Sequence, residues 1–259
     1  EKIIDFLNIE KAKQKALLDE YLNYGGFPRI VTEESKEEKL KTIDELFKSY
    51  IEKDIVYLLQ IERPEIFKLI IQLIANQLGY PVNFSSLSKN ANVSVPTLKK
   101  YLWYAEKTFS LQKITPFYTN FRKEITKSPA YYFTDPGLRN YSLGLMGNII
   151  LNDQFGLLFQ NLVHHMLKEH IKWKGWSIHF WRTTDKAEVD FIIDKKSSVL
   201  PVEVKFGDIK KPSLTRSFRS FLQKYSPPEA WIVTTGYQNM IEVHETPVRF
   251  VPYYMIGEM

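Results

Sequence analysis

The sequence predicts an α+β protein of more than one domain, helical in its first half and alternating between helices and strands in its second. Apolar residues recur every three or four positions over much of residues 10–109, whereas runs rich in β-branched and aromatic residues fill residues 176–254. A chain of 259 residues is also long enough for two or three small domains. We expect a helical lead-in at 1–61, a second domain at 62–147 and a third at 148–259.

The composition excludes several classes of protein. A hydrophobic fraction of 44% and a charged fraction of 25% exclude wholesale disorder. No uncharged apolar stretch is long enough to span a bilayer, so we expect no membrane partner. The absence of cysteine excludes disulfides, thiolate metal sites and cysteine catalysis, and it fits the cytoplasmic location that we expect. Because the chain begins at Glu1 and not at methionine, we also expect it to be part of a longer protein.

The first region, residues 1–61, has a helical pattern without catalytic features. Apolar residues at helical spacing predict a helix over 10–23, and the following Gly-Gly-Phe-Pro sequence at 25–28 breaks it. The charged residues 33–41 suit an exposed helix start or a loop. A further amphipathic helix is predicted from Ile43 to about Leu59.

The second region, residues 62–147, has the element order of a winged helix-turn-helix. Helices are predicted at 65–78, 84–91 and 95–109, the last of them capped by Ser94, and strands at 111–118 and 130–134. In such a domain the third helix enters a DNA groove, while the loop between the two strands contacts phosphates.

Positive charge concentrates in this region and makes DNA the expected partner. Residues 61–150 hold 11 basic and 5 acidic residues, a net charge of +6, whereas the whole chain carries +5. Six basic residues are the expected DNA contacts, on the third helix and in the loop between the strands: Lys99, Lys100, Lys107, Arg122, Lys123 and Lys127. The alternative is a winged helix that docks protein, and the outward-facing Trp103 favours coverage by another domain.

The third region, residues 148–259, has the element order α-β-β-β-α-β with an extra terminal strand. Helices are predicted at 155–166 and 214–225, and strands at 176–182, 187–194, 199–206, 229–235 and 248–254. This order is typical of an α/β domain built on a mixed sheet.

Two neighbouring strands of this region carry two acids and a lysine. If residues 195–198 form the loop of a hairpin, the numbers of paired residues sum to 393 and Asp190 lies opposite Glu203. Glu203 and Lys205 then share one face of their strand. Opposed carboxylates repel each other unless a cation, a raised pKa or a metal ion compensates. The pattern therefore predicts one pocket that holds Asp190, Glu203 and Lys205.

An acid followed by Glu-x-Lys on the next strand, in this order of elements, resembles the PD-(D/E)xK nuclease superfamily and its restriction-endonuclease-like fold. The resemblance implies that Asp190 and Glu203 bind Mg²⁺ and that Lys205 activates the attacking water. The sequence departs from the pattern at Val189, which replaces the motif's proline, and at Gln160, where many relatives carry a glutamate. Because an amide is a poorer Mg²⁺ ligand than a carboxylate, we expect a nuclease-like phosphodiesterase site of weak or lost activity.

Five motifs extend the resemblance to nearly the whole chain. They are Tyr-Leu-Asn-Tyr-Gly-Gly-Phe-Pro at 21–28, Tyr-Ile-Glu-Lys-Asp-Ile at 50–55, Tyr-Phe-Thr-Asp-Pro-Gly-Leu at 132–138, Glu-Val-Asp-Phe at 188–191 and Pro-Val-Glu-Val-Lys at 201–205. Their order is similar to the C-terminal part of a family of archaeal and bacterial predicted AAA-type ATPases, in which an ATPase domain precedes a winged helix and a nuclease-like domain. The resemblance implies that the chain's own N-terminal ATPase domain is a partner and that ATP binds only there. The chain itself contains no Gly-x-x-x-x-Gly-Lys-Ser/Thr loop.

Arg182 and three histidines are further candidates for functional residues. Arg182 ends a strand near the predicted pocket, where it could hold a scissile phosphate or pair with Asp185, and both alternatives stay open. His164, His165 and His170 favour packing over a metal site, because adjacent helical residues point about 100° apart. Three functions therefore compete: a DNA-binding module with a nuclease-like site, a catalytically dead binding module, and a regulator that docks protein.

Overall fold

The computed structural model describes residues 2–58, 60–108, 110–118, 128–149, 152–183, 185 and 187–258. The chain forms two compact units. Unit 1 comprises Glu1–Leu78, Asn83–Gln112 and Phe133–Leu158, and unit 2 comprises Gly79–Val82, Lys113–Tyr132 and Phe159–Met259. These units cut across the predicted boundaries after residues 61 and 147, because residues 113–132 cluster with the C-terminal part of the chain.

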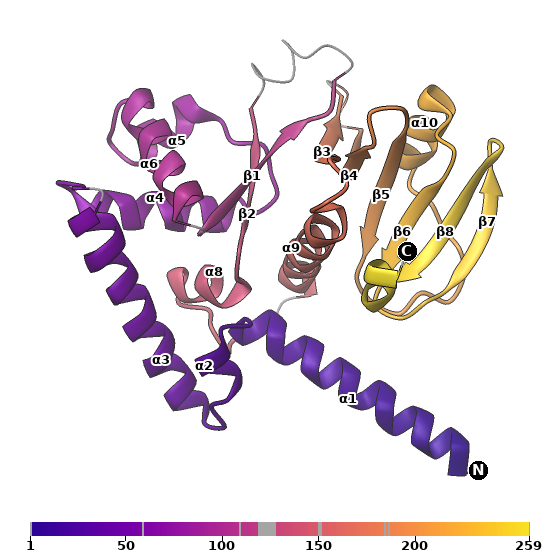
Figure 1. Cartoon of the computed structure of the whole chain (residues 1–259), viewed down its shortest axis with the longest axis horizontal. Helices are drawn as coiled ribbons and strands as arrows, with labels where there is room; N and C mark the ends of the chain where they lie inside the picture. The colour runs from indigo at the N-terminus through magenta and orange to yellow at the C-terminus, as the bar shows by residue number, and fades with distance from the viewer. Residues whose placement is uncertain are drawn as a thin grey trace. The chain divides into compact units, whose positions relative to one another are not determined.

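Unit 1 is helical (Figure 1). Its elements are α1 (Lys2–Tyr24), α2 (Pro28–Val31), α3 (Lys36–Ser49), a π-helical segment (Tyr50–Leu58), α4 (Pro64–Asn76), α5 (Phe84–Asn90), α6 (Val95–Lys107) and α8 (Pro136–Ser142). Helices α4, α5 and α6 lie where the sequence predicts them. The predicted cap of α6 is confirmed as well, since the hydroxyl of Ser94 accepts a hydrogen bond from the N–H of Thr97 at 3.2 Å.

The prediction of an exposed stretch at 33–41 is wrong for one of its lysines. Helix α3 begins at Lys36, and Lys39 is only 4% exposed. Its ammonium group donates to the carbonyl of Ile30 at 2.8 Å and pairs with Glu20 at 3.0 Å. A lysine with a long aliphatic stem can fill a buried position when its charged end finds such partners. The helix predicted over 43–59 also changes character, because it becomes π-helical at Tyr50.

A buried carboxylate connects the end of α1 to the start of α8. Asp135 accepts the N–H of Leu138 at 3.2 Å and, with its other oxygen, the N–H of Gly26 at 2.7 Å. A Cβ atom on Gly25 would lie 2.0 Å from Asp135, and Gly25 has a φ of +85°. Glycine is therefore required at 25 for both space and backbone conformation. Burial raises the pKa of Asp135, although three backbone N–H groups oppose that shift.

Unit 2 is built on a mixed sheet of eight strands among the described residues, in the order β2-β1-β3-β4-β5-β6-β8-β7 (Figure 1). The strands are β1 (Leu111–Pro116), β2 (Ala130–Phe133), β3 (Ser177–Arg182), β4 (Glu188–Asp194), β5 (Val199–Lys205), β6 (Ala230–Thr234), β7 (Asn239–Val243) and β8 (Thr246–Pro252). Helices α9 (Asn152–Ile171) and α10 (Arg216–Tyr225) complete the order, with a final 3₁₀ turn at Tyr253–Glu258.

The two helices cover opposite faces of this sheet. The ring of Phe191 on β4 lies 5.8 Å from that of His164 on α9, whereas the next residue, Ile192, packs in one cluster with Phe218 and Leu222 of α10. Since successive strand residues point to opposite faces, α9 and α10 bury the two sides of β4. The predicted acids Asp190 and Glu203 lie on β4 and β5, the neighbouring strands of this part of the sheet.

The two strands predicted for the wing, β1 and β2, are neighbours, and they also belong to the large sheet. Strand β1 pairs in parallel with β3, so both strands extend the large sheet. The apolar and aromatic side chains of β2 are all buried, as a strand covered on both faces requires. Strand β7 was not predicted, because its mostly exposed residues lack the apolar alternation of a half-buried strand. None of the helices in the described ranges is long and apolar enough to cross a membrane.

Substitution of Asp135 by alanine should destabilise unit 1 by about 2–4 kcal/mol. The estimate combines the loss of a helix cap, about 1 kcal/mol, with about 1–3 kcal/mol for a buried N–H left unpaired. Chemical denaturation followed by far-ultraviolet circular dichroism measures the change. The matched control is Asp208→Ala, at an exposed aspartate. Equal unfolding midpoints for Asp135→Ala and the control would contradict this role of Asp135.

Candidate functional site

The hairpin of β4 and β5 has the predicted register. Four residue pairs form the ladder, from Asp194 with Val199 to Phe191 with Val202, and the residue numbers of each pair sum to 393. The ladder stops one pair before Asp190 and Glu203. The two acids therefore lie at the point where the strands stop pairing, and their side chains are available to other partners.

Beyond the last residue pair of this ladder, the side chain of Asp190 on β4 accepts a backbone hydrogen bond from β5. Its Oδ2 atom accepts the backbone N–H of Val204 at 2.7 Å, and its Oδ1 atom accepts the side-chain amide of Gln160 on α9 at 3.0 Å. Burial raises the pKa of Asp190 to about 7, the charges of Glu203 and Glu188 act in the same direction, and the Val204 N–H opposes the shift. Asp190 thus reaches both an adjacent strand and the α9 layer.

Glu203 faces the start of α10. Its Oε2 atom accepts the hydroxyl proton of Thr215 at 2.8 Å, and its Oε1 atom lies 3.8 Å from the ammonium group of Lys205. Burial raises the pKa of Glu203, while the hydroxyl of Thr215 and the charge of Lys205 oppose that shift. Thr215 also caps α10 through the N–H of Phe218, so the same hydroxyl fixes the helix start and the acid.

Lys205 is held by the loop before α10. Its ammonium group donates to the carbonyl oxygen of Ser213 and lies 3.2 Å from the Ser213 hydroxyl. Together with Glu203, these contacts give the lysine three oxygen partners from the protein. The structure thus pairs Asp190 with Gln160 and Glu203 with Lys205, and the charge of Glu203 acts on Asp190. We call these four residues the acidic network, and a single pocket for the two acids and the lysine stays a prediction.

This network does not fit a shared divalent cation as it stands. Each oxygen of the two carboxylates already faces a protein donor: Gln160 and Val204 for Asp190, and Thr215 and Lys205 for Glu203. A metal ion shared by both carboxylates would compete with these donors for the lone pairs of the oxygens. In the described part of the chain, no cluster of three acids or histidines has the arrangement of a metal site. The predicted Mg²⁺ ligands are thus close together but bound to protein donors.

Thr215 and Ser213 were missed at the sequence level. Thr215 lies inside the helix predicted at 214–225, whereas α10 begins at Arg216. Threonine is a recognisable cap residue, and that signal could have moved the predicted start to 216 and identified Thr215. Its contact with Glu203 joins residues far apart in the pattern, and no spacing rule predicts it. Ser213 accepts from Lys205 with its carbonyl and its hydroxyl oxygen, and it lies in a loop, where the sequence carries no periodicity.

The predicted DNA contacts of α6 form an exposed surface of lysines and aromatic rings. The ammonium groups of Lys99, Lys100 and Lys107 lie 5.0, 5.6 and 5.6 Å from the ring centres of Phe84, Tyr104 and Trp103. None of the three lysines forms an ion pair with a described residue. Trp103 is 51% exposed. We call these three lysines with Trp103 and Tyr104 the α6 surface. The other predicted contacts, Arg122, Lys123 and Lys127, lie outside the described residues.

Arg182 forms an ion pair that was not predicted, and its contact with a scissile phosphate stays a prediction. Its guanidinium lies 3.7 Å from Glu188, its cross-strand neighbour, and not beside Asp185. The cross-strand position explains the choice, because opposed residues of a ladder have adjacent side chains. Among the histidines, His164 is buried and stacks on Tyr132 with ring centres 4.5 Å apart, and burial keeps its pKa well below the usual value.

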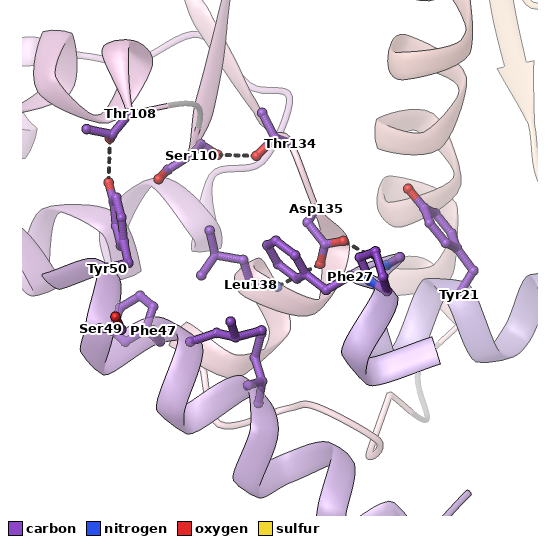
Figure 2. A pocket seen from close by; sticks show the side chains of 14 residues that line it. Tyr21, Phe27, Phe47, Ser49, Tyr50, Thr108, Ser110, Thr134, Asp135 and Leu138 are labelled. Atoms are coloured by element: carbon purple, nitrogen blue, oxygen red, sulfur yellow. Dashed lines mark hydrogen bonds between the residues drawn. The ribbon is translucent and has the colours of Figure 1, made fainter. Parts of the chain in front are cut away.

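Unit 1 contains a pocket of about 700 Å³ that the sequence analysis did not anticipate (Figure 2). Three of the quoted motifs contribute to its wall, through Tyr21 and Phe27, Tyr50, and Asp135 and Leu138. Motifs that meet in space could have suggested a shared site, but sequence order alone does not show that they meet. The pocket and the acidic network lie in different units.

Comparisons with known proteins identify two families in the chain. The family described as Domain of unknown function (DUF8612) matches residues 15–148, and that described as Domain of unknown function (DUF4143) matches residues 155–254. An uncharacterized protein of Haemophilus influenzae is 26% identical over 247 residues, which cover 93% of this chain and 58% of the relative. Uncharacterized proteins of Mycobacterium tuberculosis and Mycobacterium bovis are each 24% identical over 200 residues, 76% of this chain and 44% of the relative.

The chain therefore spans about half the length of the curated relatives that it matches, 58% of one and 44% of the others. The first match covers more than half of the chain and corresponds to most of unit 1, and the second corresponds to most of unit 2. The chain belongs to the DUF8612 family and carries a DUF4143 domain after it.

Proposed function

We propose that the chain is a nucleic-acid-binding module that acts through the α6 surface and whose nuclease-like centre does not cleave. The observation that carries the proposal is the set of three exposed lysines on α6 that have no acidic partner among the described residues. Lysines that are not neutralised within the protein attract phosphate, and DNA is the partner that the net charge of residues 61–150 favours.

The aromatic rings support the same assignment. Each lysine lies above a ring, so its stem is held against the surface while its charge points to solvent. Trp103 offers an exposed ring face on which an unpaired base can stack. Phosphate attraction combined with ring stacking is the usual way in which proteins bind nucleic acid without reading its sequence.

The acidic network supports binding without cleavage. Phosphodiester cleavage at a site of the PD-(D/E)xK type requires carboxylates that can take a metal ion and a lysine that can reach water. Here the carboxylates of Asp190 and Glu203 accept protein hydrogen bonds, and Lys205 is bound to Ser213. Gln160, at the position of a third acid, supplies an amide donor in place of a negative charge.

We further propose that the module serves a longer protein with an N-terminal ATPase domain. The resemblance of the five motifs to the C-terminal part of AAA-type ATPases supports this, as do relatives that extend well beyond the matched region. Any ATP would then bind outside this chain, and nucleic acid binding here would place that domain on its substrate.

Protein docking is the second candidate, and the exposure of Trp103 favours it. An exposed tryptophan is an unusual surface residue and a frequent anchor of protein interfaces. Under this alternative, Trp103→Ala would abolish binding of the partner protein, and the chain would bind no nucleic acid at any salt concentration.

Charge reversal on α6 should weaken DNA binding. We expect Lys100→Glu combined with Lys107→Glu to lower the affinity for DNA about tenfold or more at low salt, and to reduce the salt dependence by about two ion equivalents. Fluorescence anisotropy with duplex, junction and single-stranded DNA measures both effects. The matched control is Lys15→Glu with Lys36→Glu, two exposed lysines of unit 1 with the same change of charge.

Two outcomes would contradict nucleic acid binding by the α6 surface. One is an absence of binding to every DNA at low salt. The other is an equal loss of affinity in the α6 variant and in the control, because net charge and not the α6 surface would then determine binding.

The acidic network should show no cleavage. We expect plasmid, linear, junction and single-stranded DNA to remain intact with the wild-type chain in Mg²⁺ or Mn²⁺, because a metal ion would have to compete with the protein donors of both carboxylates. Gel electrophoresis of wild type, Asp190→Asn and Lys205→Ala makes the comparison. Cleavage by the wild type that both substitutions abolish would establish a nuclease and contradict this part of the proposal.

A further inference from the structure

The pocket of unit 1 has the dimensions of a small-molecule site. Its volume of about 700 Å³ lies within the range of about 300–1,000 Å³ that is usual for such sites. It is formed entirely within unit 1, between the loop after α1, helix α3, the end of α6 and the segment after β2. None of the lysines of the α6 surface lines it.

Aromatic and aliphatic side chains make most of the wall. Figure 2 shows the rings of Phe27, Phe47 and Tyr50 around the same space, with Leu138 between them. Phe47 is buried, and its ring packs 5.2 Å from that of Tyr141, which fixes its position. Rings held in this way offer flat surfaces against which another planar ring can stack.

One hydroxyl in the wall makes no hydrogen bond to a described residue. Ser110 is only 3% exposed, and its side-chain oxygen makes no hydrogen bond to a described residue, whereas its carbonyl accepts the hydroxyl of Thr134 at 3.3 Å. In Figure 2 the Ser110 hydroxyl points away from Thr134 and toward the space between Tyr50 and Leu138. A hydroxyl that lines a pocket and makes no hydrogen bond within the protein can donate to or accept from a ligand, and such a contact is directional.

The charges of the wall select against an ionic ligand. The described residues of the lining include no lysine, arginine or histidine, so a phosphate or carboxylate would have no counter-charge from them. Asp135 is the only carboxylate among these described residues, and its two oxygens already accept the N–H groups of Gly26 and Leu138. A cation would have to compete with these bonds. An uncharged ligand needs no counter-charge and does not have to displace the hydrogen bonds of Asp135.

We propose that this pocket binds an uncharged planar aromatic heterocycle whose polar edge bonds to Ser110. The rings of Phe27, Phe47 and Tyr50 provide the stacking surface, and the hydroxyls of the wall can donate to or accept from the edge of the heterocycle. The inference is independent of nucleic acid binding, because it uses none of the residues of the α6 surface.

Saturation-transfer NMR with adenosine and indole tests the proposal on the whole chain. We expect the wild type to saturate at least one of these two neutral probes, and adenosine monophosphate to receive markedly less saturation than adenosine, because its phosphate lacks a counter-charge. Ser110→Ala should weaken binding of the probe about three- to tenfold, as the loss of one hydrogen bond predicts. Ser49→Trp, which adds a ring at the wall, should abolish it.

The control is Ser220→Trp, at an exposed serine on α10 of unit 2, and circular dichroism verifies that each variant folds. Absence of saturation for both probes in the wild type would overturn the proposal. Saturation that persists unchanged in a folded Ser49→Trp chain would overturn it too, since the probe would then bind elsewhere.

Discussion

The hydrogen bond from the Val204 N–H to the Asp190 carboxylate is the contact on which the acidic network depends. It uses a backbone donor that would otherwise continue the ladder of β4 and β5, so the strands part at the two acids. Once the strands part, Asp190 reaches Gln160 on α9 and Glu203 reaches Thr215 at the start of α10. Burial raises the pKa of both acids, and the hydrogen bonds from Val204 and Thr215, together with the charge of Lys205 beside Glu203, oppose these shifts.

Unit 1 also contains a buried carboxylate, that of Asp135, which is stabilised by protein donors. There too a buried carboxylate accepts backbone N–H groups, and it joins segments that lie far apart in the sequence, the loop after α1 and the start of α8. The glycines at 25 and 137 leave room for it, because a Cβ on either would lie under 3 Å from its carboxylate. In both units, a motif that resembles a functional signature contains an acid whose partners are protein donors. The α6 surface differs, because its lysines have no acidic partner in the described part of the chain.

The sequence was most informative where a local rule determines the geometry. The register of β4 and β5 follows from a four-residue loop and from alternation, and the cap of α6 follows from Ser94. It was least informative where distant segments meet. The parallel pairing of β1 with β3 and the salt bridge of Arg182 with Glu188 both depend on strand pairings that spacing does not encode. The pocket of unit 1 requires several segments to be placed at once, and hydrophobic periodicity describes only one element at a time.

The central claim is that protein donors, and not a metal ion, satisfy the carboxylates of Asp190 and Glu203. The most direct test is a crystal of the chain grown with Mn²⁺ and measured near the manganese absorption edge, so that bound metal appears in the anomalous difference map. The account predicts no anomalous peak between these side chains, with Gln160 and Thr215 still hydrogen bonded to them. A peak within about 2–2.6 Å of both carboxylates would contradict it.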